Sequence, residues 1–238
     1  MTNAKTYPTL TAEEAASLIP SGAMVAVSGF TPAGAPKAVP RALAKRAREL
    51  HQAGKAFQIK LLSGASTGAA CDDELARAEA VSWRAPYMTS ASMRELANTG
   101  KIDFVDMHLS HVAQAVMEGF LGPIDFAVVE ATEITPDGQV YLTTGIGNAP
   151  TFLQCAEKVV IELNAYHSPR LREMADILVL PPPPHRAPSR FTTRSTGSAG
   201  PMPKSTRLRW LASFTPTSRT EAVRSRRRTR PAGGLLST

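Results

Sequence analysis

The chain has 238 residues, a hydrophobic fraction of 43 % and a formal charge of +7, so it holds enough apolar material for one sizeable domain or two small ones. No segment approaches the roughly 18 apolar residues of a membrane span, and no basic stretch with an apolar run opens the chain. These features exclude a membrane protein and predict a soluble, unprocessed one without a membrane partner.

The positive charge is concentrated at the end of the chain. From Ser189 onward eleven Lys or Arg accompany one acid, Glu221, which leaves 16 bases and 19 acids, a net charge of −3, in residues 1–188. The basic run Arg224–Arg230 could contact nucleic acid, but no interleaved aromatic residue or known motif accompanies it. We therefore expect no nucleic-acid partner.

Short apolar runs alternate with amphipathic stretches through the first 165 or so residues. A capping box at Thr11–Glu14 predicts a helix to about Leu18, because Ser or Thr followed three residues later by Glu satisfies the first amides of a helix. The remaining expected elements are strands at Met24–Ser28, Phe57–Leu62, Ala80–Trp83, Ile124–Ala131, Gln139–Thr143 and Lys158–Leu163, and helices at Pro36–Ala53, from Asp72, at Ser92–Asn98, at Leu109–Glu118 and after Asn148.

This alternation predicts an α/β fold, an open and mostly parallel sheet flanked by helices, with a hairpin return after Pro136–Gly138. Residues 1–188 form this domain. Residues 189–238 are rich in Arg, Ser, Thr, Pro and Gly without periodicity, which predicts a disordered basic tail.

Three loops rich in small residues follow predicted strands, at Ser28–Gly34, Ser63–Gly68 and Thr143–Asn148. Ligands of open α/β sheets bind at the carboxyl ends of strands, where glycine lets backbone amides approach an anionic or carbonyl group. None of the loops matches a dinucleotide or nucleotide-phosphate motif. Ligand binding and tight packing turns therefore both remain open for them.

Other polar residues are weaker candidates. Glu130 ends an apolar strand, where we expect it to organise backbone amides, with acid/base chemistry as the alternative. Arg84 could bind a carboxylate, but a surface salt bridge is the commoner arrangement. His108 and His111 lack a metal-binding pattern, and we expect no metal site.

The two cysteines, Cys71 and Cys155, lie in unrelated surroundings. We interpret them as reduced, buried small hydrophobes, which agrees with a cytoplasmic location.

Several segments, in order and spacing, resemble the N-terminal domain of class I coenzyme A transferases of the acetyl-CoA hydrolase/transferase family, the succinyl-CoA:acetate and propionyl-CoA:succinate type. The segments are Ser28–Thr31, Pro36–Leu43, Leu62–Gly68, Val128–Gly138, Gly147–Leu153 and Ala156–Asn164. The resemblance covers residues from about 11 to 188.

The resemblance implies that CoA moves between acetyl-, succinyl- or propionyl-CoA and a small carboxylate such as acetate or succinate. In the family a glutamate of a second α/β domain attacks the thioester, so the resemblance implies no catalytic residue in this chain. It implies that Gly29, Phe30, Ser66 and Thr89 line the pocket for the acid. It also implies homo-oligomers for full-length members, and an acyl-CoA substrate in place of a permanently bound cofactor.

The family's continuation, a segment resembling IPIHDPLDRIG, is not found after the proline-rich strip. A shifted reading frame combines the third base of each codon with the first two bases of the next. In that frame the codons of Phe191–Ala199 permit the sequence HDPLDRIG, and the codons of Met202 and Pro203 require Ala. We hypothesise a frameshift near Ala187–Ser189, real or a sequencing error. The fragment is then expected to be inactive alone. Acetyl-CoA hydrolysis and a non-catalytic module that binds a carboxylate or a partner are the alternatives.

Overall fold

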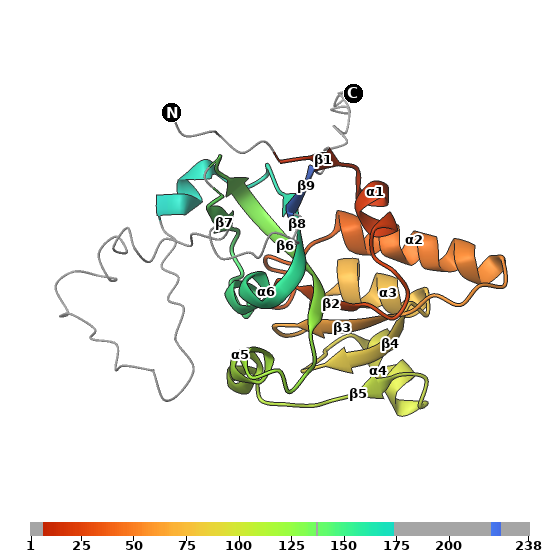
Figure 1. The fold of residues 1–238 in the computed structure, drawn as a ribbon. Helices are drawn as coiled ribbons and strands as arrows, with labels where there is room; N and C mark the ends of the chain where they lie inside the picture. Colours follow the sequence, from red (N-terminus) through yellow and green to blue (C-terminus); the bar gives the residue numbers. More distant parts are fainter. Residues whose placement is uncertain (1–6, 137, 174–219, 225–238) are drawn as a thin grey trace, which may run out of the picture.

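The computed structural model describes residues 7–136, 138–173 and 220–224, and a single nine-stranded sheet runs through them (Figure 1). The strands are β1 (Thr9–Leu10), β2 (Met24–Val27), β3 (Ile59–Ser63), β4 (Val81–Ala85), β5 (Asp103–Phe104), β6 (Ile124–Ile134), β7 (Val140–Leu142), β8 (Ala156–Leu163) and β9 (Thr220–Arg224). Their order is β1-β9-β8-β6-β2-β3-β4-β5.

All neighbouring strands in this order are parallel, and only β7 pairs antiparallel, with the end of β6. The mostly parallel α/β sheet and the hairpin return predicted from the sequence are therefore confirmed. Strands β2 to β5 build outward in one direction and β6, β8 and β9 in the other, so the order reverses between β2 and β6.

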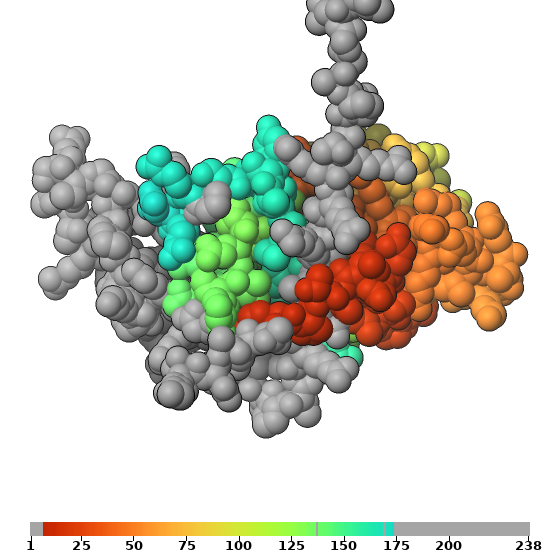
Figure 2. Space-filling view, turned by 90° about the horizontal axis from the view of Figure 1, so that it is seen from above, coloured from red at the N-terminus to blue at the C-terminus, as the bar shows by residue number. Residues whose placement is uncertain are grey.

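Helices cover both faces of the sheet. They are α1 (Ala12–Ser17), α2 (Ala38–Gln52), α3 (Glu74–Arg77), α4 (Ala91–Asn98), α5 (Leu109–Met117) and α6 (Ala149–Cys155), with a π-helical turn η1 (Ala69–Asp73) and a 3-10 turn η2 (Pro169–Glu173). Helices α1, α2, α3 and α4 pack on one face of the sheet through one core cluster. Helices α5 and α6 pack on the other face through a second cluster. Figure 1 shows these two layers on opposite sides of β2 and β6, and Figure 2 shows α1 beside α2.

Local sequence determines where the first helix begins. The Glu14 amide donates to Thr11 Oγ1 at 3.1 Å, and the Thr11 amide donates to Glu14 Oε2 at 2.7 Å. This reciprocal pair is the predicted capping box, worth about 1 kcal/mol. The central strands are stabilised by burial, since every residue of β2 and most residues of β6 are buried. Such strands, covered on both faces, read as continuous apolar runs.

The observed boundaries differ from the predicted ones by a few residues, and β1 and β5, with two residues each, were not predicted. Most of residues 189–238, for which disorder was predicted, lies outside the described residues. Thr220–Arg224 is described as β9, which pairs with β8 and β1, and the disorder expected for the remainder of the tail stays a prediction. Among the described residues no helix is long and apolar enough to cross a membrane.

Candidate functional site

The three small-residue loops meet at one edge of the sheet. Gly29 follows β2, Gly64 follows β3, and the loop from Thr143 follows β7, which lies against the end of β6. The carboxyl ends of parallel strands at a reversal of strand order are where open α/β sheets bind ligands. The small-residue loops singled out from the sequence therefore lie together at this edge.

Much of the space between the loops is filled by the loops themselves. A side chain on Gly145 would overlap the carbonyl of Ala33, and one on Gly34 would lie 2.6 Å from the Gly145 oxygen. A side chain on Gly64 would lie 3.1 Å from the Gly29 oxygen. At these contacts glycine allows one backbone segment to lie close to another. This favours the interpretation of the loops as tight packing turns.

A polar cluster lies beneath these loops, between β2 and β6. Ser28 Oγ donates to the Gly34 oxygen at 2.6 Å and accepts the Glu130 amide at 2.9 Å. The Glu130 carboxylate is almost fully buried, pairs with Lys37 and accepts Thr143 Oγ1 at 2.8 Å. The expectation that Glu130 organises backbone amides is wrong for its carboxylate, which binds two side chains and so joins the loop after β7 to the start of α2.

A different carboxylate organises amides. Glu162, buried in β8, accepts the backbone amides of Lys37, Ala38 and Val39 at 2.9 to 3.2 Å. A negative charge at a helix N-terminus satisfies unpaired amides and complements the helix dipole. Glu162 thus occupies the position at the start of α2 that an anionic ligand would take. The sequence offered a signal for it, an acid within an apolar strand, but this signal was applied only to Glu130.

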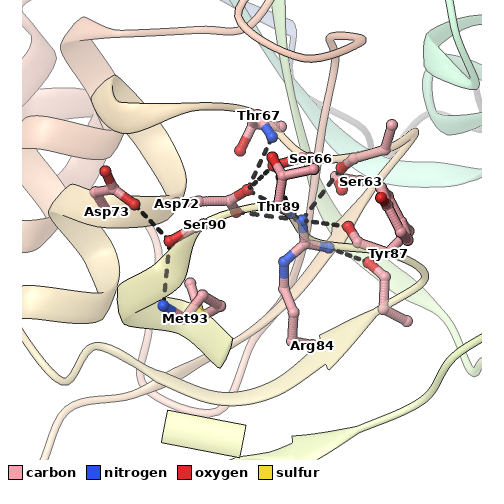
Figure 3. A network of polar contacts seen from close by, with 12 residues as sticks. Ser63, Ser66, Thr67, Asp72, Asp73, Arg84, Tyr87, Thr89, Ser90 and Met93 are labelled. Atoms are coloured by element: carbon pink, nitrogen blue, oxygen red, sulfur yellow. Dashed lines mark hydrogen bonds and ion pairs between the residues drawn. The ribbon is translucent and has the colours of Figure 1, made fainter. Parts of the chain in front are cut away.

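The next strands carry a buried ion pair (Figure 3). Arg84 in β4 and Asp72 in η1 are both fully buried, and Arg84 Nη2 lies 3.2 Å from Asp72 Oδ1. The guanidinium also donates to the backbone oxygens of Ala65, Ala85 and Tyr87. The expectation of a surface salt bridge at Arg84 is therefore wrong. Sequence could not show this, because a charged side chain is buried only where a partner elsewhere in the fold compensates it.

Asp72 connects this pair to two residues implied by the resemblance. Asp72 Oδ2 accepts the Thr67 amide at 2.8 Å and Ser66 Oγ at 3.1 Å. Ser66 Oγ in turn accepts Thr89 Oγ1 at 2.7 Å and the Thr89 amide at 3.1 Å. Ser66, after β3, and Thr89, after β4, are thus brought together, with Ser66 buried and Thr89 exposed.

The other two residues implied by the resemblance lie on the loop after β2. Gly29 is buried with φ +119°, a conformation that favours glycine, and an added side chain would lie 2.8 Å from Ala35 Cβ. Phe30 is 51 % exposed and closes a tight turn with Ala33. This loop adjoins the loop after β3, since an added side chain on Gly68 would lie 3.3 Å from Pro32 Cβ. The edge above β2, β3 and β4 therefore presents Phe30 and Thr89 to solvent.

The histidines lie elsewhere, on the surface. His108 caps the N-terminus of α5 through its side chain, and its ring centroid lies 5.6 Å from that of His111. Within the described ranges no three His, Cys, Asp or Glu residues gather in a way that could hold a metal ion.

A hollow of about 440 Å³ lies at the opposite edge of the sheet, beside the amino ends of β2, β6 and β8. Two of its charged side chains, Arg46 and Asp125, have protein partners. Arg46 donates to the carbonyls of Ala16 and Ile19, and Asp125 accepts the Met24 amide. We take the carboxyl edge as the candidate site because the loops that follow the strands lie there.

Cys71 lies next to Asp72 in η1, and its thiol is unreactive at neutral pH. Both cysteines are free, Cys71 buried and Cys155 half-buried. Burial, with a smaller contribution from the Asp72 charge, raises the pKa of the Cys71 thiol from 9.0 to about 12. At neutral pH the residue is a small apolar group, because the thiolate is the reactive form.

This shift predicts an alkaline loss of stability. Because the folded pKa exceeds the unfolded one, the unfolded chain ionises first, and stability present below pH 9 declines as the pH rises toward 12. In Cys71→Ala this contribution disappears, so its stability deficit relative to wild type should shrink by about 1.4 kcal/mol per pH unit above pH 9. Urea unfolding at pH 8, 9.5 and 10.5 measures it, and a deficit that stays constant would contradict the burial argument.

The chain is similar to known proteins in both sequence and fold. The family whose sequence profile matches residues 1–184 is described as the acetyl-CoA hydrolase/transferase N-terminal domain. The chain is 59 % identical over 177 residues to the propanoyl-CoA:succinate CoA transferase of Escherichia coli K12, covering 74 % of this chain and 36 % of the relative. It is 44 % identical over 179 residues to the succinyl-CoA:acetate CoA-transferase of Clostridium kluyveri, covering 75 % and 33 %.

An acetyl-CoA hydrolase of Schizosaccharomyces pombe is 37 % identical over 182 residues. The chain spans about a third of the length of these curated relatives. Among solved structures, an acyl-CoA transferase of Escherichia coli O157:H7 matches with a TM-score of 0.54 at 16 % identity, covering 69 % of this chain and 44 % of that one. The glutaconate coenzyme A-transferase of Acidaminococcus fermentans matches with a TM-score of 0.52 at 13 % identity, covering 65 % and 66 %. These structures share the fold.

Proposed function

The chain belongs to the acetyl-CoA hydrolase/transferase family through its N-terminal domain, and from this we propose that it supplies the acid-binding side of a CoA transferase. The reaction moves CoA between acetyl-, succinyl- or propionyl-CoA and a small carboxylate such as acetate or succinate. The 59 % identity to a propanoyl-CoA:succinate CoA transferase is the observation that carries this proposal. We call the group of residues Gly29, Phe30, Ser66 and Thr89 the acid-side wall.

The nucleophile of the reaction is proposed to lie outside these residues. Among the described residues the buried carboxylates are Asp72, Glu130 and Glu162, and each is held by protein donors. Glu162 binds three amides, Glu130 binds Lys37 and Thr143, and Asp72 binds Arg84. A carboxylate so stabilised is a poor nucleophile, because attack on a thioester would give up those hydrogen bonds. We therefore propose that the 238 residues alone do not transfer CoA.

Transfer is favoured over hydrolysis by the order of similarity. The two CoA transferases are 59 % and 44 % identical to the chain, and the acetyl-CoA hydrolases 33 to 37 %. A partner-binding role fits the same edge, since Phe30 and Tyr87 expose 51 % and 47 % of their surface there. We take this apolar exposure as a contact surface for the rest of the enzyme, and homo-oligomers as the form of the complete protein.

The tail is proposed to be the same gene read out of frame from near Ala187–Ser189. The family match ends at residue 184, just before the composition changes. Resequencing the locus tests this directly. If the codons of residues 189–221 do not encode the family's continuation in another frame, the tail is a genuine part of the protein.

The acid-side wall can be tested by titrating the ¹⁵N-labelled chain with sodium acetate at constant ionic strength, with sodium chloride as the control. We expect acetate to shift the backbone amides of Gly29, Phe30, Ser66 and Thr89 more than chloride does. Shifts confined to Arg46 and Lys158, in the hollow at the opposite edge, would place acid binding elsewhere and contradict the proposal.

A further inference from the structure

The hydroxyl of Ser66 is the central atom of a buried hydrogen-bond chain (Figure 3). It lies 3.1 Å from Asp72 Oδ2, 2.7 Å from Thr89 Oγ1 and 3.1 Å from the Thr89 amide nitrogen. A hydroxyl has one proton to donate and two lone pairs that accept. Ser66 therefore has a partner for each of its three hydrogen-bonding positions.

The direction of this chain follows from the chemistry of its ends. An ionised carboxylate only accepts, so the Ser66 proton points to Asp72. The amide of Thr89 only donates, so it takes one lone pair of Ser66. The Thr89 hydroxyl must then donate to the other lone pair, which gives the order Thr89 to Ser66 to Asp72.

Arg84 stabilises the acceptor at the end of the chain. Its Nη2 lies 3.2 Å from Asp72 Oδ1, and the same nitrogen lies 3.2 Å from the backbone oxygens of both Ala65 and Tyr87. Ala65 precedes Ser66, and Tyr87 lies two residues before Thr89. One guanidinium thus connects the loop after β3 to the loop after β4, and its positive charge compensates the buried Asp72 carboxylate.

We propose that Asp72 and Arg84 are positioning residues of the acid-side wall, which fix Ser66 as an acceptor and leave the Thr89 hydroxyl as the group that turns to the carboxylate of the acid. The inference rests on the proposed function for the identity of the ligand. Ser66 is buried and fully bonded, whereas Thr89 is exposed. When Thr89 turns outward, Ser66 still accepts the Thr89 amide, so no buried acceptor is left without a partner.

A neighbouring network provides a matched control. Asp73, next to Asp72, accepts the hydroxyls of Ser90 and Ser92, and Ser90 Oγ accepts the Met93 amide at 3.1 Å to cap α4. Ser90 adjoins Thr89 in sequence but makes none of the hydrogen bonds that reach Ser66. Ser90→Ala therefore removes a comparable hydroxyl from the same loop without touching the proposed chain.

Hydrogen exchange tests the positioning without any ligand. In the 238-residue chain, Ser66→Ala should speed exchange of the Thr89 amide at least about fivefold, because its acceptor is lost. Asp72→Asn should speed exchange of the Thr67 amide, because a neutral side chain is a weaker acceptor than the carboxylate. Ser90→Ala should speed exchange of Met93 and leave Thr89 unchanged. Equal effects of Ser66→Ala and Ser90→Ala on the Thr89 amide would overturn the positioning role.

Acetate titration of the same variants tests the contact residue. Thr89→Val should raise the apparent Kd for acetate about tenfold, Thr89→Ser should stay within about twofold of wild type, and Ser66→Ala should fall between them. If the wild-type chain shows no acetate-specific shifts, the proposed function fails while the exchange data still decide the positioning. If acetate binds but Thr89→Val binds as wild type does, the assignment of Thr89 is wrong.

Discussion

Arg84→Met should lower the free energy of unfolding by about 3 to 5 kcal/mol, the range found when one member of a buried ion pair is removed. Methionine fills similar space but leaves Asp72 charged, buried and without its cation. It also leaves the backbone oxygens of Ala65, Ala85 and Tyr87 without this donor. The loss follows from the uncompensated charge more than from lost attraction, so Asp72→Asn combined with Arg84→Met should recover part of it.

Urea unfolding measures this effect, with Arg77→Met as the control. Arg77 lies 3.6 Å from Asp73 and 3.9 Å from Glu74 with most of its side chain in solvent. Exposed pairs contribute less than about 1 kcal/mol. If Arg84→Met costs no more than Arg77→Met, the burial of the ion pair between Arg84 and Asp72 is contradicted.

Gly145→Ala should lower the free energy of unfolding by about 3 kcal/mol, at the upper end of the usual cost of overpacking. The added carbon would overlap the carbonyl oxygen of Ala33 and lie 2.8 Å from its carbonyl carbon. Backbone cannot rotate away as a flexible side chain can, so the loops after β2 and β7 must separate. The amides of the Ser28–Gly34 loop should shift as well.

Gly100→Ala is the matched control for this substitution. Gly100 has φ +71° and no atom within 4 Å of the added carbon, so only backbone strain of about 1 kcal/mol opposes alanine there. Thermal and urea unfolding of the two variants separate overlap from strain. A Gly145→Ala variant as stable as Gly100→Ala would contradict the close packing of the loops.

The sequence predicted the elements whose causes are local. The capping box at Thr11 and Glu14 lies within four residues, and the apolar run of β6 shows its burial directly. The loops after β2 and β3 also lie at one edge, because neighbouring parallel strands present their carboxyl ends together. Two-residue strands such as β1 are too short to show periodicity.

The sequence failed where the partner is distant in the chain. Glu162 caps a helix that begins more than a hundred residues earlier, and Arg84 is buried only because η1 brings Asp72 to it. In the candidate site the resemblance supplied Ser66 and Thr89 as equals. The structure distinguishes the two residues, because Ser66 is a buried acceptor and Thr89 carries an exposed hydroxyl.

We propose that residues 1–184 are the acid-side domain of a CoA transferase. It is tested most directly by joining them to the segment of the Escherichia coli relative that follows its matching region, and by assaying CoA transfer from propionyl-CoA to succinate. We expect no turnover from the 238-residue chain alone and clear turnover from the joined protein, reduced by Thr89→Val but not by Ser90→Ala. Turnover by the 238 residues alone, or a folded joined protein without turnover, would contradict the account.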